Sequence, residues 1–229
     1  LFDKSRDLLD SINVSVLDDR LLQEFYDEWY MLMSLMSEYT AGTQLHASYE
    51  ARAEHFRRLI LSSPYKDTYA YVRAEMTELS ERGHTEKAIG ILENYLKRWR
   101  RTNHEYAMVC FDLAELYGKL GNSTKRLYYL VQSAISDVYS SSKENNSLRL
   151  LADELFDQGD VERAYNYMNV SIEDANFYGT RLRNIQNAHI LPRIFSAYIV
   201  QQHTQRMHIF GLLVAVSVVA IALIVAVFF

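Results

Sequence analysis

Residues 151–168, LADELFDQGDVERAYNYM, decide the fold of this chain. Leu151-Ala152 opens a helix-favouring run that stops at Gly159, and a second run begins at once with Asp160. Glycine supplies the left-handed residue that ends a helix, and aspartate is a preferred N-cap of the next one. The stretch therefore predicts two short helices joined by a tight turn.

The same pattern occurs twice upstream, in residues 75–92 and 113–130. The turn glycines Gly83, Gly121 and Gly159 stand 38 positions apart. A fixed period indicates a repeat array, in which each helical hairpin buries its apolar stripe against the next. The residues that define the repeat are the turn glycines and the small or aromatic side chains between the helices: Gly83, Ala88, Ala114, Tyr117, Gly121, Ala152, Gly159 and Ala164.

The pattern resembles the tetratricopeptide repeat, which has a Leu-small pair, an aromatic three residues on, a turn glycine and then Ala-x-x-x-aromatic. Leu113-Ala114-x-x-Tyr117 matches the first part of this pattern. Two positions depart from it, because Glu75 replaces the leucine of the first unit and Arg126 replaces the small residue of the second. The period exceeds the usual 34, by about one helical turn. We therefore expect irregular packing within an intact array of hairpins.

The C-terminal segment differs from the rest of the chain. Residues 209–229, IFGLLVAVSVVAIALIVAVFF, contain no charged side chain. At about 1.5 Å per residue they would span about 30 Å, the hydrocarbon thickness of a bilayer. Elsewhere, helix breakers are few, since the 229 residues include only 8 Gly and 2 Pro. The sequence predicts an all-α fold: a tetratricopeptide-like α-solenoid followed by one transmembrane helix in the lipid bilayer.

The predicted organisation has four segments. They are the N-terminal helices of a degenerate repeat (1–64), three repeat units (65–179), a capping and juxtamembrane helix (180–208) and the transmembrane helix (209–229). Pro192 lies within the third segment, where we expect it to kink the helix or divide it. The pairs Gly211/Ala215 and Ala222/Ala226 permit close contact between spans, so a homodimer stays open.

Several functions are disfavoured by composition and spacing. The formal net charge of −5 argues against a nucleic-acid partner for this part of the chain. His104-Glu105 begins like a zinc-protease helix, but Met108 stands where the second histidine ligand must be. GNSTK (121–125) falls at a repeat turn, which predicts a helix cap by Ser123 or Thr124 in place of a phosphate loop. We expect no catalytic residues, metal site, cofactor or enzyme activity.

What remains for function is a surface. In tetratricopeptide proteins the first helix of each unit lines the ligand groove, and Arg and aromatic residues there suit an extended protein or peptide ligand. Solvated helix faces are the alternative reading for each residue. Carried across by the repeat register, the predicted groove residues are Arg73, Thr77, Phe111, Glu115, Arg149, Asp153 and Phe156.

A closer resemblance covers residues 133–199. The residues that show it are Ser142-Lys143-Glu144, Leu151-Ala152, Gly159-Asp160, Glu162-Arg163-Ala164-Tyr165, Glu173-Asp174-Ala175-Asn176-Phe177-Tyr178 and Ile190-Leu191-Pro192. This segment is similar to a bacterial family of membrane-anchored tetratricopeptide regulators. The resemblance implies a periplasmic repeat domain, one span through the inner membrane and a cytoplasmic regulatory region, often considered transcriptional, outside this sequence.

Two functions follow as expectations. The first is a sensor whose periplasmic repeats bind a protein or peptide and signal through the Pro192 helix to the span. The second is a tail-anchored scaffold whose repeats face the cytosol and assemble protein complexes at a membrane. Charge on the one flank that the sequence contains, with Arg193 and Arg206, does not choose between the two orientations.

Overall fold

The structure is a computed structural model that describes residues 2–142, 146–179 and 181–228. Lys143, Glu144, Thr180 and Phe229, which belong to motifs or segments named above, lie outside the described residues. Within the described residues the chain forms ten α-helices and one short 3-10 helix, and no strand is present. The predicted all-α fold is confirmed.

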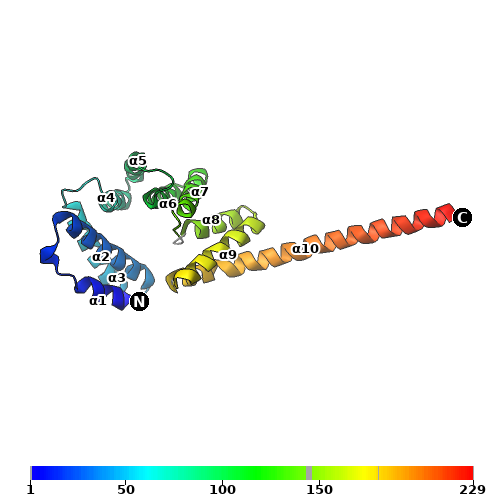
Figure 1. The fold of residues 1–229 in the computed structure, drawn as a ribbon, viewed down its shortest axis with the longest axis horizontal. Helices are drawn as coiled ribbons and strands as arrows, with labels where there is room; N and C mark the ends of the chain where they lie inside the picture. The colour runs from blue at the N-terminus through cyan, green and yellow to red at the C-terminus, as the bar shows by residue number, and fades with distance from the viewer. Residues whose placement is uncertain (1, 143–145, 180, 229) are drawn as a thin grey trace. The chain divides into compact units, whose positions relative to one another are not determined.

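Figure 1 shows the helices in chain order. They are α1 (Phe2–Asp10), the 3-10 helix η1 (Val14–Val16), α2 (Asp19–Tyr39), α3 (His46–Leu61), α4 (Tyr69–Glu81), α5 (Thr85–Leu96), α6 (His104–Lys119), α7 (Ser123–Tyr139), α8 (Asn146–Asp157), α9 (Val161–Tyr178) and α10 (Arg181–Phe228). The three predicted repeat units correspond to α4–α5, α6–α7 and α8–α9.

Each repeat hairpin turns at its glycine, as predicted. Gly83, Gly121 and Gly159 have φ values of 79°, 70° and 84°, in the left-handed region that favours glycine. In every turn the amide after the glycine donates to the carbonyl five residues earlier, with N···O distances of 2.8, 2.9 and 2.9 Å. This is the Schellman motif, which satisfies the last carbonyls of one helix while the chain reverses into the next.

The residue after the turn glycine caps the following helix. The Asp160 carboxylate accepts a hydrogen bond from the Arg163 amide at 3.1 Å and so caps α9, as predicted. At the equivalent place the Asn122 side chain accepts from the Lys125 amide at 3.0 Å. The predicted cap of α7 by Ser123 or Thr124 is therefore wrong, because the residue that follows the left-handed glycine takes this position in both turns.

The small residues that define the repeat are buried in the interior of the hairpins. The fully buried side chains at these positions are Ala88, Ala114, Ala152 and Ala164, and the bulky fully buried ones are Leu92, Leu130 and Met168. Arg126, which departs from the small-residue pattern, lies against Gly118. A Cβ added to Gly118 would stand 3.1 Å from Cδ of Arg126, which is too close for comfortable packing. A glycine in the first helix thus makes room for the large side chain in the second.

The chain divides into two compact units. The first comprises residues 1–100 and 112–126, and the second comprises 101–111 and 127–229, so α6 contributes residues to both. In the first unit, α2 and α3 form the helical pair expected in the N-terminal segment. Their core consists of Trp29, Leu32, Met33, Met36 and Ala53. The ring of Phe56 stacks on Trp29 with centroids 5.3 Å apart.

In the second unit, α10 packs on α9 before it leaves the repeats. Ile194 is fully buried, and the rings of Tyr165 and Tyr198 stack with centroids 4.0 Å apart. Helix α10 is not divided at Pro192. It is one continuous helix of 48 residues with Pro192 inside it. Pro192 and Ala188 are both exposed, so water can satisfy the carbonyl that the missing proline N–H leaves without a helix partner.

Beyond its contact with α9, α10 extends as a single exposed helix, drawn orange to red in Figure 1. Its most apolar window has a mean hydropathy of 3.0, and none of that window is buried. Among the described residues this is the one helix long and apolar enough to cross a membrane. Burial within the protein therefore gives no reason for its apolar composition, whereas a bilayer does.

Candidate ligand-binding surface

Arg73, the first predicted groove residue, is held inside the first unit. Its guanidinium forms an ion pair with Asp27 of α2, and only 13% of the Arg73 side chain is exposed. The guanidinium carbon also lies 5.5 Å from the ring centroids of Tyr30 and Tyr69. Burial alone would lower the pKa of Arg73, but the charge of Asp27, together with Tyr69, Asp112 and Tyr30, raises that pKa above its usual value. Arg73 therefore joins α2 to α4.

Tyr69 and Asp112 extend this network. The Tyr69 hydroxyl donates to Oδ2 of Asp112 at 2.7 Å. Burial raises the pKa of Asp112 to about 6, although the Tyr69 hydrogen bond and the Arg73 charge both act to lower it. Burial likewise raises the pKa of Tyr69 well above its usual value. We call Asp27, Tyr30, Tyr69, Arg73 and Asp112 the Arg73 cluster.

The other predicted groove residues of the first unit are less constrained. The Thr77 hydroxyl donates to the carbonyl of Arg73 at 2.9 Å, which is a bond within α4. Glu115 is exposed, and its carboxylate stands 4.0 Å from the guanidinium of Arg126. Arg73 and Thr77 are thus neighbours, while Glu115 remains accessible to solvent.

In the second unit the structure brings Asp153 and Phe156 together under α10. Nη1 of Arg193 lies 3.7 Å from Oδ1 of Asp153. The guanidinium carbon lies 5.2 Å from the centroid of the Phe156 ring. Arg149 bonds instead to Oδ1 of Asn146, and Phe111 is half-buried. The predicted groove residues Asp153 and Phe156 are therefore already in contact with a cation, the guanidinium of Arg193 in α10.

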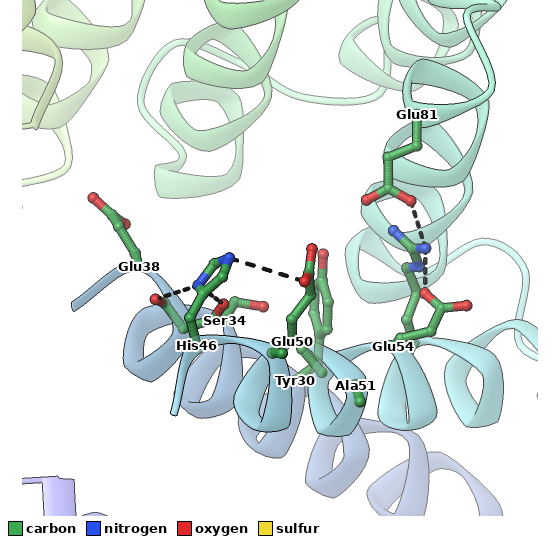
Figure 2. A pocket seen from close by; sticks show the side chains of 12 residues that line it. Tyr30, Ser34, Glu38, His46, Glu50, Ala51, Glu54 and Glu81 are labelled. Atoms are coloured by element: carbon green, nitrogen blue, oxygen red, sulfur yellow. Dashed lines mark hydrogen bonds and ion pairs between the residues drawn. The ribbon is translucent and has the colours of Figure 1, made fainter. Parts of the chain in front are cut away.

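A cleft that the sequence did not predict lies on α2 and α3 of the first unit, with a volume of about 620 Å³. Figure 2 shows Glu54 and Glu81 converging from α3 and α4 on one guanidinium. That group is Arg57, which pairs with Glu54 and stands 2.6 Å from Glu81. At the other end, Nδ1 of His46 lies 3.0 Å from Oγ of Ser37.

Carboxylates dominate this cleft, since its lining also includes Glu38 and Glu50. Burial alone would lower the pKa of Arg57, but Glu81 and Glu54 raise it above its usual value. Glu54 also accepts from Nε of Arg58 at 2.9 Å. Glu54 is therefore already paired with two arginines of its own helix α3, and Glu81 is paired with one of them. The only sign of these ion pairs in the sequence was the spacing of Glu54 from Arg57 (i, i+3) and Arg58 (i, i+4).

An apolar groove lies on α7, α8 and α9 of the second unit, with a volume of about 390 Å³. Its lining includes Val131, Ile135, Leu148 and Tyr167. At its edge Val138 is 72% exposed. Such a surface suits contact with apolar side chains.

Two features often used in catalysis, a metal-binding cluster and a reactive thiol, can be checked in the structure. Within the described part of the chain, no group of three His, Cys, Asp or Glu residues is placed to hold a metal ion. Cys110 is fully buried, and burial raises its thiol pKa to about 12, so the nucleophilic thiolate is strongly disfavoured at neutral pH.

Comparison with protein-family models matches residues 1–189 to the model described as the SusR N-terminal TPR domain. A search of curated proteins finds no match. The matched residues include every helix of the repeats and the first part of α10.

Proposed function

The chain belongs to the family of SusR N-terminal TPR domains, and from this membership we propose that it is the sensing part of a membrane-anchored bacterial regulatory protein. Its repeats bind a protein or peptide on the periplasmic side, and residues 209–228 cross the inner membrane. This part of the protein has no enzyme activity, and it signals by a change in the position of the membrane-spanning helix.

Helix α10 is the observation that supports this proposal. One uninterrupted helix contains both the buried Ile194, which packs in the second unit, and the fully exposed apolar segment that suits a bilayer. A continuous helix has no loop in which a displacement could be absorbed. A change in how α10 sits on α9 would therefore move or rotate the span.

A ligand produces such a change only if it binds one arrangement of the repeats more tightly than another. The stacked pair Tyr165–Tyr198 and the contacts of Arg193 are the groups that would rearrange. Signalling in this proposal is a shift between two packings of α10 on the α8–α9 pair.

Thiol labelling tests on which side of the membrane the repeats lie, because the one native cysteine is unreactive and gives no background. Lys87 is exposed on α5, so Lys87→Cys introduces one reactive thiol into the repeats, whereas Cys110 is buried. A membrane-impermeant maleimide added to cells with a permeabilised outer membrane should label Lys87→Cys and leave the parent chain unlabelled. Labelling only after the inner membrane is opened would instead place the repeats in the cytosol, as the tail-anchored scaffold requires.

A further inference from the structure

Three residues of α8 surround the head group of Arg193. Nη1 of Arg193 lies 3.7 Å from Oδ1 of Asp153, and Nη2 donates to Oδ1 of Asp157 at 3.3 Å. The Phe156 ring lies beneath the guanidinium, 5.2 Å from its carbon. We call Asp153, Phe156 and Asp157 the Arg193 site.

The site holds its arginine loosely. Oδ1 of Asp153 is buried, and no donor among the described residues makes a hydrogen bond to it. At 3.7 Å the Arg193 nitrogen is beyond hydrogen-bond distance, and 57% of the Arg193 side chain is exposed. A buried carboxylate oxygen without a hydrogen bond is destabilising, so a better placed donor would be favoured there.

The geometry selects a guanidinium over other cations. Two carboxylates one helical turn apart lie near two different nitrogens of the same group, and its central carbon lies over an aromatic ring. A planar guanidinium offers several donors and stacks on aromatic rings, whereas the ammonium of lysine is a single point charge. The presence of Arg193 itself shows that a guanidinium fits.

We propose that the Arg193 site is a recognition site for a ligand guanidinium, and that Arg193 occupies it when no ligand is bound. This inference rests on the proposed sensing function and names the ligand class, an arginine-bearing peptide. The arriving guanidinium hydrogen-bonds to both Asp153 and Asp157 and displaces Arg193. Because Arg193 follows Pro192 in α10, its release removes a contact that ties the span helix to α8.

Competition with an internal residue has a measurable consequence. The apparent dissociation constant is the intrinsic one divided by the fraction of molecules in which the site is open. Removing the Arg193 charge should open the site in nearly every molecule, and affinity should rise.

The test uses the full 229-residue chain in lipid nanodiscs and calorimetric titration with the capped tripeptide acetyl-Gly-Arg-Gly-amide. Arg193→Gln should tighten binding by about fivefold or more, because the internal competitor is gone. Adding Asp153→Asn to Arg193→Gln should then weaken binding by about tenfold or more, because one of the two charge-assisted bonds is lost. Circular dichroism confirms that each variant is folded.

Matched controls separate this site from general electrostatics. Arg206→Gln makes the same charge change elsewhere on α10 and should leave the affinity unchanged. The same tripeptide with citrulline in place of arginine keeps the shape without the charge and should bind at least about tenfold more weakly. Acetyl-arginine-amide tests the source of the guanidinium: tighter binding of the tripeptide supports a peptide, and equal binding supports a small guanidinium compound at the same site.

Two results would overturn the proposal. One is equal affinity of the parent chain and Arg193→Gln for the arginine tripeptide, including no binding by either. The other is equal binding of the arginine and citrulline tripeptides. Labelling of Lys87→Cys is independent of both measurements, so a periplasmic repeat domain that ignores arginine would end this inference and leave the proposed placement intact.

Discussion

Two glycines seven positions apart should respond in opposite ways to the same substitution. Gly83 has φ of 79° at the first repeat turn, and Gly90 lies inside α5 without a positive φ. A Cβ added at either place would meet no atom of a more distant part of the chain within 4 Å, so clash with neighbouring side chains or helices does not distinguish the two substitutions. Only the backbone conformation distinguishes Gly83→Ala from Gly90→Ala.

The expected magnitudes follow from that difference. A left-handed residue with a Cβ costs about 1–2 kcal/mol, so Gly83→Ala should lower the free energy of unfolding by that amount. Alanine is favoured over glycine within a helix by about 0.5–1 kcal/mol, so Gly90→Ala should raise it. The two variants should differ by about 2 kcal/mol, which is about 1 M in urea midpoint for a unit of this size.

Tryptophan fluorescence is the appropriate assay. The sequence has 2 Trp, and both Trp29 and Trp99 belong to the first unit, together with the two glycines. Urea titration of the full chain in detergent therefore reports the unfolding of that unit, whatever happens to α10. Midpoints that move in the same direction, or a Gly83→Ala midpoint equal to that of the parent chain, would refute the assignment of a left-handed repeat turn.

Three further predictions concern the core, the Arg73 cluster and the span. Met168 is fully buried, so Met168→Ala should lower the free energy of unfolding by about 2–5 kcal/mol. Val170 lies on the same helix but is 44% exposed, so Val170→Ala should change the free energy of unfolding by less than about 0.5 kcal/mol. Circular dichroism in urea measures both variants. Because the folded-state pKa of Asp112 is raised to about 6, the folded chain binds its proton more tightly than the unfolded chain, so the stabilisation is complete below pH about 4 and is lost as the pH rises to about 6. The whole loss is about 3 kcal/mol, of which about 2 kcal/mol falls between pH 4.5 and pH 7. Urea midpoints at these two pH values should show this difference in the parent chain and not in Asp112→Asn. If the span dimerises through its small residues, Gly211→Leu should reduce chemical crosslinking of the protein in nanodiscs. A Gly211→Leu variant that crosslinks as strongly as the parent chain would contradict this expectation.

The repeat turns could be predicted because their cause is local. The glycine that ends a helix and the residue that caps the next are adjacent in sequence, so a fixed spacing of Gly83, Gly121 and Gly159 was enough. The apolar C-terminal helix could also be predicted, because the absence of charged side chains over residues 209–229 is visible in the sequence itself. The single cap that was predicted wrongly, at α7, was displaced by only one or two residues.

The networks could not be predicted, because they join residues far apart in sequence. Asp27 and Arg73 are 46 positions apart, and Tyr69 and Asp112 are 43 apart. A repeat register says which face of a helix a residue occupies but not which partner lies opposite. The register placed Asp153 and Phe156 on the predicted groove face, and only the path of α10 shows that Arg193 reaches them. Whether the seven groove residues bind a ligand stays a prediction.

The division of α6 between the two units has a consequence for how this protein can be taken apart. The chain enters the second unit at residue 101, returns to complete the first at 112–126, and then leaves it again. A polypeptide that stops at Arg100 would lack Asp112, the acceptor of the Tyr69 hydroxyl, and so would expose an incomplete core. Neither half is a contiguous length of sequence, and therefore no single cut releases an intact piece: insertion, splicing or proteolysis within 101–126 should damage both at once.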